Sequence, residues 1–113
     1  MHEMSIALGI VEALRGEMER SGSTRLLRAG VSLGELAGVD PQSLSFCLEA
    51  AFAEEHWERV EVEFSPKAVE VCCRTCKQRF QPLRNDYRCP ECQAAEVDVL
   101  SGEAVEIEWL EVE

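Results

Sequence analysis

Two pairs of cysteines constrain this chain more than any other feature of its sequence. Cys73 and Cys76 form one C-x-x-C pair, Cys89 and Cys92 form a second, and twelve residues separate the pairs. Each short pair turns two sulfur atoms the same way, and four thiolates suit a tetrahedral Zn(II) ion. Four protein sulfurs leave no open coordination position, so the spacing predicts a structural zinc site that staples the intervening loop.

Two disulfide bonds are the alternative interpretation of the same four cysteines, and they would need an oxidising compartment. Nothing in the sequence indicates export. No basic-then-apolar leader opens the chain, and no apolar run approaches the roughly 20 residues needed to cross a membrane. We therefore expect a reduced cytoplasm and no membrane partner.

Two further cysteines, Cys47 and Cys72, are left over after the zinc set. We expect Cys47 to pack as a small hydrophobic residue. Cys72 adjoins Cys73 and could compete with it as a ligand, but the C-x-x-C spacing favours Cys73.

The chain is strongly acidic, with a formal net charge of -11, and this disfavours nucleic acid as a partner. The charge is uneven, because residues 67–92 hold six of the eleven Lys and Arg against three acids. A locally basic loop would partly offset the double negative charge of zinc bound to four thiolates. Ordinary solvated surface charge explains the same pattern.

The first three residues, Met1-His2-Glu3, are a second place where a metal could bind. If Met1 is retained, its amine, the His2 amide nitrogen and the His2 imidazole can close two adjoining chelate rings. Glu3 or another group could then complete a square plane. Such a nitrogen-rich planar set suits Ni(II) or Cu(II) rather than zinc. Spacing alone does not separate this site from a mobile surface histidine.

Hydrophobic periodicity predicts an α+β fold in which two helices pack on one face of a small three-stranded sheet, with a zinc-ribbon-like excursion. A helix over residues 4–20 and a strand over 25–36 come first. Asp40 then caps a helix that starts at Pro41 and runs to about residue 55. Strand character returns at residues 60–64, 69–71, 97–99 and 105–109. Residues 1–71 and 97–113 are expected to form the α/β domain, and residues 72–96 the zinc-binding subdomain.

The predicted core faces follow from the same periodicity. In the first helix they are Met4, Ala7, Leu8, Val11, Leu14 and Met18, with Ile10 widening the stripe, and in the second Leu44, Cys47, Leu48, Ala51 and Phe52. In the first strand Leu27, Ala29, Val31 and Leu33 are expected to point one way, and Arg28, Gly30 and Ser32 the other. Asp40 could also bind a metal, but capping alone explains it, and His56 is expected at the surface.

The sequence shows no Gly-rich phosphate loop, no internal repeat and no nucleophile with a partnered base, so an enzyme is not expected. Two rival classes stay open. One is a zinc-ribbon interaction or regulatory module without a second metal. The other is a hydrolytic or redox metalloenzyme, which would need an open metal position and a base.

The opening M-H-E, the run G-E-L-A-G-V-D-P-x-S-L-x-F over residues 34–46 and the late pair of C-x-x-C motifs together resemble the HypA hydrogenase maturation factors. The resemblance covers essentially the whole chain. The C-x-x-C pairs alone are not specific to that family, but their combination with M-H-E at the start is.

This resemblance implies a nickel metallochaperone that helps to load the active site of [NiFe] hydrogenase. It implies that His2, with Met1 and Glu3 beside it, binds nickel, and that Cys73, Cys76, Cys89 and Cys92 hold structural zinc. It also implies two partners, a HypB-like GTPase and the precursor of the hydrogenase large subunit. Supply to urease accessory proteins stays open, as does a role for Asp40 near the nickel end.

Overall fold

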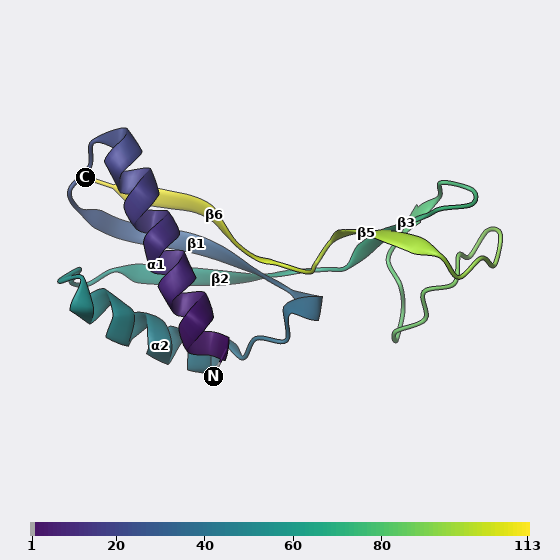
Figure 1. The fold of residues 1–113 in the computed structure, drawn as a ribbon, viewed down its shortest axis with the longest axis horizontal. Coiled ribbons are helices and arrows are strands. Elements are labelled where there is room, and N and C mark those ends of the chain that lie inside the picture. Colours follow the sequence, from purple (N-terminus) through teal and green to yellow (C-terminus); the bar gives the residue numbers. More distant parts are fainter. Residues whose placement is uncertain (1) are drawn as a thin grey trace. The chain divides into compact units, whose positions relative to one another are not determined.

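The computed structural model describes residues 2–113 as two helices, a short 3-10 helix and six strands. Their bounds are α1 His2–Ser21, β1 Leu26–Gly34, η1 Glu35–Ala37, α2 Pro41–Glu54, β2 Glu61–Lys67, β3 Glu70–Cys73, β4 Arg79–Phe80, β5 Val97–Ser101 and β6 Val105–Val112. The strands form two three-stranded sheets with the orders β2-β1-β6 and β4-β3-β5 (Figure 1).

The chain divides into two compact units. The helical unit comprises Met1–Ser32, Val39–Ser65 and Val105–Glu113, and the cysteine unit comprises Leu33–Gly38 and Pro66–Ala104. The functional division expected from the sequence, with boundaries at residues 72 and 96, stays a prediction.

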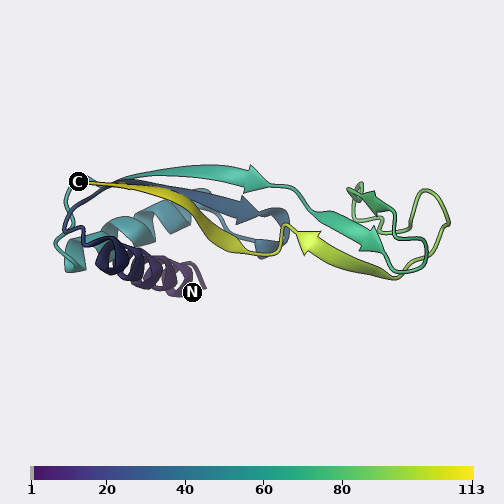
Figure 2. The same ribbon diagram turned by 90° about the horizontal axis from the view of Figure 1, so that it is seen from above.

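In the helical unit both helices lie on one face of the sheet, as predicted (Figures 1 and 2). β1 is the central strand. Figure 2 shows β1 and β2 running in the same direction and β6 running in the opposite one. Parallel neighbours need a crossover connection, and α2 supplies it between β1 and β2.

The core of the helical unit lies between the helices and β1. Its buried apolar residues are Ala7, Ile10, Val11, Leu14 and Met18 of α1, Leu26, Ala29 and Val31 of β1, and Leu44, Cys47, Leu48, Ala51 and Phe52 of α2. All five core positions predicted for the second helix are therefore confirmed.

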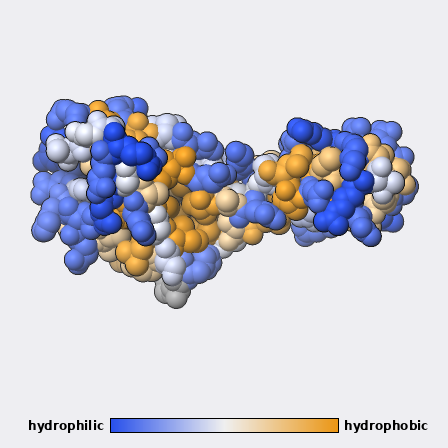
Figure 3. Space-filling model, turned by 45° about the horizontal axis from the view of Figure 1, so that its top comes forward, coloured by the Kyte–Doolittle hydropathy of each residue, from blue (hydrophilic) through white to orange (hydrophobic). Residues whose placement is uncertain are grey.

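Two positions predicted for the core face of α1 are wrong, because Met4 is 36% exposed and Leu8 is 55% exposed. The buried arc of the helix ends near Val11, and Leu8 lies about 60° beyond that edge at 3.6 residues per turn. Figure 3 shows hydrophobic side chains, in orange, at the surface of this unit.

α1 begins at His2, two residues earlier than expected, which places His2 and Glu3 in its first turn.

The alternating pattern of β1 suggested that its second face is open to solvent. The structure shows otherwise, because Gly30 and Ser32 on that face are buried as well. The Trp109 side chain lies directly over Gly30, so that a Cβ atom at this position would collide with the indole ring. The Arg28 guanidinium lies 5.5 Å from the centre of the same ring and forms ion pairs with glutamates on both neighbouring strands. Only glycine leaves room for Trp109 here.

Asp40 is the N-cap of α2, as predicted. Its carboxylate accepts a hydrogen bond from the Gln42 backbone N–H at 3.2 Å and another from the Ser43 hydroxyl at 2.9 Å. Near the other end of α2, Arg15 of α1 donates two hydrogen bonds to Glu55 at 2.7 and 3.0 Å. The Arg15–Glu55 contact links α1 to the C-terminal end of α2.

In the cysteine unit β3 pairs antiparallel with both β4 and β5, with Val71 opposite Phe80 on one side and opposite Val99 on the other. The sequence predicted strand character on both sides of the cysteine loop but not that these strands form a sheet of their own. The apolar residues buried in this unit, within the described part of the chain, are Val69, Val71, Cys73 and Cys89.

Candidate metal centres

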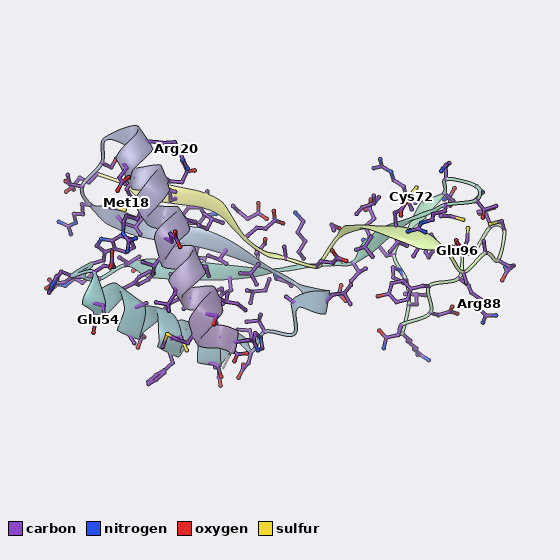
Figure 4. All side chains as sticks on the ribbon, viewed as in Figure 1. Met18, Arg20, Glu54, Cys72, Arg88 and Glu96 are labelled. Carbon is purple, nitrogen blue, oxygen red and sulfur yellow. The ribbon has the colours of Figure 1, made fainter. Side chains whose placement is uncertain are left out.

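The four cysteines of the two C-x-x-C pairs come together in the cysteine unit. Their Sγ atoms all lie within 4.8 Å of one another, and the Cys73–Cys92 and Cys76–Cys89 separations are both 3.5 Å. A tetrahedral ion with Zn–S bonds of about 2.3 Å separates its sulfurs by about 3.8 Å. The cluster is therefore the right size for one such ion. Figure 4 shows several sulfur atoms, in yellow, in the cysteine unit, where Cys72 is labelled.

Each pair is held by the same turn. The Lys77 N–H donates to the Cys73 carbonyl at 2.9 Å, and the Gln93 N–H donates to the Cys89 carbonyl at 2.9 Å. Within each turn a backbone N–H also points at the first sulfur, from Cys76 to Cys73 at 3.5 Å and from Glu91 to Cys89 at 3.4 Å. The two turns therefore share their backbone hydrogen bond, whereas the N–H that reaches the sulfur comes from the third residue after Cys73 and from the second residue after Cys89.

Lys77 and Gln93, the residues that follow the two pairs, have φ angles of 68° and 67°. This left-handed conformation is easy for glycine and unfavourable for residues with a Cβ atom. The sequence showed that both turns lack glycine at this position. The structure shows that both turns nevertheless adopt the backbone that glycine favours.

The sulfurs differ in how readily they lose a proton. The backbone N–H of Cys76 stabilises the Cys73 thiolate and lowers the pKa of that thiol to about 6. The backbone N–H of Gln78 favours the thiolate at Cys76, but burial and the neighbouring sulfurs outweigh it and raise the pKa of Cys76 to about 12. At Cys92 the backbone N–H of Ala94 also favours the thiolate, but the neighbouring Cys73 thiol and burial raise the pKa overall. A bound cation would replace the protons that the crowded sulfurs otherwise keep.

Cys72 does not belong to this cluster. It precedes Cys73 on β3, so its side chain points to the opposite face of the strand. Its sulfur approaches the carbonyl oxygens of Cys73 and Lys77 at 3.7 and 3.6 Å. Cys47 is buried on α2, in the position expected of a small hydrophobic residue.

The second candidate centre lies at the start of α1. Met1 lies outside the described residues. The His2 Nε2 atom is 3.2 Å from a carboxylate oxygen of Glu3, and the His2 side chain is 55% exposed while that of Glu3 is 14% exposed. In the described part of the chain, the four cysteines are the one group of three or more His, Cys, Asp and Glu side chains that could share an ion. Among the described residues, neither Asp40 nor His56 therefore completes a group of three with His2 and Glu3.

The helix gives this position two properties that matter for a cation. His2 is the first residue of α1, and the first four N–H groups of a helix have no acceptor within it. The His2 amide proton can thus be lost without breaking a helical hydrogen bond. The start of a helix carries partial positive charge, which disfavours a cation, and the Glu3 carboxylate offsets that charge.

Within residues 2–113 no helix has the length and apolar content needed to span a bilayer. The four-cysteine cluster and the small α+β frame define a class, namely small metal-binding proteins in which a four-cysteine site accompanies a helical unit.

Comparison with known proteins makes the class more specific. The sequence profile described as "Hydrogenase/urease nickel incorporation, metallochaperone, hypA" matches residues 1–112. The chain belongs to the HypA family.

Two relatives illustrate the match. The hydrogenase maturation factor HypA of Chlorobium limicola is 37% identical over 113 residues, covering 100% of this chain and 97% of its own. That of Streptomyces avermitilis is 36% identical over 111 residues, covering 95% and 83%. The solution structure of the nickel metallochaperone HypA from Helicobacter pylori shares the fold, with a TM-score of 0.77 at 22% identity over 97% of this chain and 96% of that one.

Proposed function

We propose that this chain is a nickel metallochaperone that binds Ni(II) at its N-terminus and helps to insert it into the large subunit of [NiFe] hydrogenase. The observation that carries the proposal is the match of the family profile over residues 1–112, which includes His2 at the first position of α1. The nickel is cargo, to be bound and released, and the zinc is structural.

The nickel ligands in this proposal are the Met1 amine, the His2 amide nitrogen and the His2 imidazole, with Glu3 beside them. The position of His2 supports it, because the amide is free of helical hydrogen bonds and the imidazole is exposed. Nitrogen donors in a plane suit Ni(II). The proposal requires Met1 to be the first residue of the mature protein.

The zinc ligands are Cys73, Cys76, Cys89 and Cys92. The size of the cluster and its four sulfur donors support zinc over metals that prefer oxygen. Zinc at this site would complete the small core of the cysteine unit. All six cysteines are unpaired, which supports the reducing cytoplasm expected from the sequence.

The partners in this proposal are a HypB-like GTPase and the precursor of the hydrogenase large subunit. Since the sequence has no nucleotide-binding loop, a nucleotide-driven step would need another protein. We place the GTPase contact near His2, at the start of α1, because metal transfer requires the two sites to approach. The family description also names urease, so urease accessory proteins are further candidate clients.

Nickel titration of matched proteins tests the site. We expect the protein that starts at Met1 to bind one Ni(II), and we expect binding to be lost with one added residue in front or with His2→Ala. The added residue converts the amine into an amide, which is not a neutral nitrogen donor. His56→Ala is the control, because His56 is the one other histidine and lies after α2.

The same titration separates the rival classes. Tight one-to-one nickel binding by the extended protein would exclude the N-terminal site. A zinc-ribbon interaction module would bind no nickel in any of the four proteins, and a metalloenzyme would turn over a substrate when loaded.

A further inference from the structure

A groove of about 830 Å³ runs between α1 and β6 in the helical unit, and sequence reasoning did not find it. From α1 it is lined by Gly9, Ala13 and Gly16 among others, and from β6 by the consecutive residues 106–110. We propose that this groove binds an extended, basic segment of a partner protein, which adds to the sheet as a strand beside β6.

The α1 side of the groove includes a row of residues with no side chain or only a methyl group. Gly9, Ala13 and Gly16 follow one another at spacings of four and three, which places them on one face of α1. A glycine inside a helix costs about 1 kcal/mol relative to alanine, so each needs a reason. Packing within the described part of the chain supplies no reason for glycine at positions 9 and 16. A Cβ atom on Gly9 would meet nothing within 4 Å, and one on Gly16 would meet only the Arg20 guanidinium at 3.9 and 4.0 Å. The small residues therefore leave space that this chain does not fill.

The opposite wall is the edge of a sheet. β6 is an outer strand in the order β2-β1-β6. Successive residues of a strand point to opposite faces, so five consecutive lining residues mean that the groove meets the edge of β6 rather than one of its faces. An edge strand presents unpaired backbone N–H and C=O groups, which are the template for an added strand.

The charges of the groove select the occupant. Four glutamates line it, against one basic residue, Arg20, which already pairs with Glu17. The lining glutamates are Glu12, Glu17, Glu106 and Glu108. Figure 4 shows Arg20 at the end of α1, beside β6.

A second copy of this chain is a poor occupant of the same edge. Antiparallel pairing of β6 with β6 would bring Glu106 and Glu108, which point to the same face of the strand, against the same two residues of the second copy, and like charges across strands are destabilising. A strand with Lys or Arg at alternate positions would instead meet these carboxylates as opposite charges. The acidic edge thus discourages self-association and favours a basic partner.

The probe that tests this proposal is a synthetic peptide of alternating lysine and valine, as long as β6 and blocked at both ends. Two matched peptides serve as controls, one with glutamate in place of lysine and one with proline at a central position, which cannot donate a backbone hydrogen bond. The lysine peptide should bind the zinc-loaded full chain, shift the NMR signals of residues 106–110 and slow amide exchange along β6. Binding of the proline and glutamate peptides should be at least tenfold weaker.

Variants locate the site. Gly9→Leu should fill the groove and lower peptide affinity at least tenfold, whereas Gly9→Ala keeps the groove open and should change it little. Glu106→Lys should lower affinity by up to about fivefold, in line with the energy of cross-strand charge pairs. Glu103→Lys, an exposed change in the cysteine unit, is its control. An unchanged NMR spectrum outside the groove shows that each variant is folded.

Several outcomes would overturn the proposal. Gly9→Leu protein that binds as well as wild type, or shifts that map to α2 instead of β6, would place the peptide elsewhere. A peptide that becomes helical on binding would exclude strand addition. Concentration-dependent dimerisation through β6 would make a second copy the occupant. None of these outcomes depends on nickel binding at His2.

Discussion

The two units of this chain are stabilised in different ways. The largest fully buried apolar side chains of the helical unit are Leu14, Leu44, Leu48 and Val31, whereas those of the cysteine unit are Val71 and two of the metal-site cysteines. The helical unit carries 15 acidic and 5 basic residues, and the cysteine unit carries 7 and 6. We expect apolar burial to be enough to fold the first unit, whereas the core of the second is so small that we expect this unit to need the ion proposed for its four cysteines.

The largest expected effect is the loss of the ion. Cys89→Ala should abolish zinc binding and unfold the cysteine unit, because structural zinc contributes on the order of 10 kcal/mol to the folding of such small units. The helical unit should keep its NMR spectrum. Cys72→Ala is the matched control, since Cys72 lies beside the site but outside the cluster. Full zinc content in the Cys89 variant would show that the four-sulfur assignment is wrong.

Acidification should act on the same unit. Near neutral pH the Cys73 thiol, with its pKa lowered to about 6, is ionised, whereas Cys76 and Cys92 have raised pKa values and hold protons that zinc must displace. Each displaced proton makes zinc affinity fall about tenfold per pH unit as pH drops, so the protons of Cys76 and Cys92 alone give about a hundredfold per unit. A competition titration with a zinc chelator between about pH 6 and 8 measures the slope. A flat profile would mean that the sulfurs are already ionised before the metal arrives.

Truncating a core side chain of the helical unit should destabilise that unit and leave the cysteine unit unchanged. Leu14→Ala removes a fully buried side chain of α1 and should lower the free energy of unfolding of the helical unit by about 2–5 kcal/mol. Zinc content should not change. Leu8→Ala, on the same helix but 55% exposed, should change stability by less than about 0.5 kcal/mol. Denaturant unfolding followed beside zinc analysis tests both statements, and zinc loss in the Leu14 variant would show that the two units are not independent.

The smallest effect is expected at the turns of the metal site. Lys77→Gly and Gln93→Gly should each stabilise zinc-loaded protein by up to about 1 kcal/mol, because glycine relieves the left-handed backbone. Thr75→Gly lies in the same turn without a positive φ and should be neutral or destabilising. Destabilisation at residues 77 and 93 would mean that their side chains contribute more than the backbone strain removes.

The sequence was informative where a local rule decides the outcome. The C-x-x-C spacing found the four cysteines that cluster, Asp40-Pro41 found the start of α2, and helical periodicity found the whole buried face of that helix. Sequence reasoning failed where contacts with other elements decide which residues are buried. The arc of α1 that is buried depends on what α1 packs against, so Met4 and Leu8 were misplaced.

Contacts between segments far apart in the chain were also missed. Nothing near Gly30 announces that Trp109, some eighty residues later, lies across it, and the groove beside β6 follows from the same strand order. The position of His2 shows a different limit. The M-H-E motif can be read from the sequence. Only the structure shows that α1 begins at His2, so that the amide N–H of this residue has no acceptor within the helix.

Trp109 lying against Gly30 also gives the molecule an optical property. Both tryptophans, Trp57 and Trp109, belong to the helical unit, and the single tyrosine, Tyr87, belongs to the cysteine unit. Light absorbed only by indole therefore reports on one unit, and the phenol reports on the other. Because Arg28 lies 5.5 Å from the centre of the Trp109 ring, separation of β1 from β6 should change indole emission even while the cysteine unit stays folded. Each of the two units therefore carries its own kind of natural fluorophore.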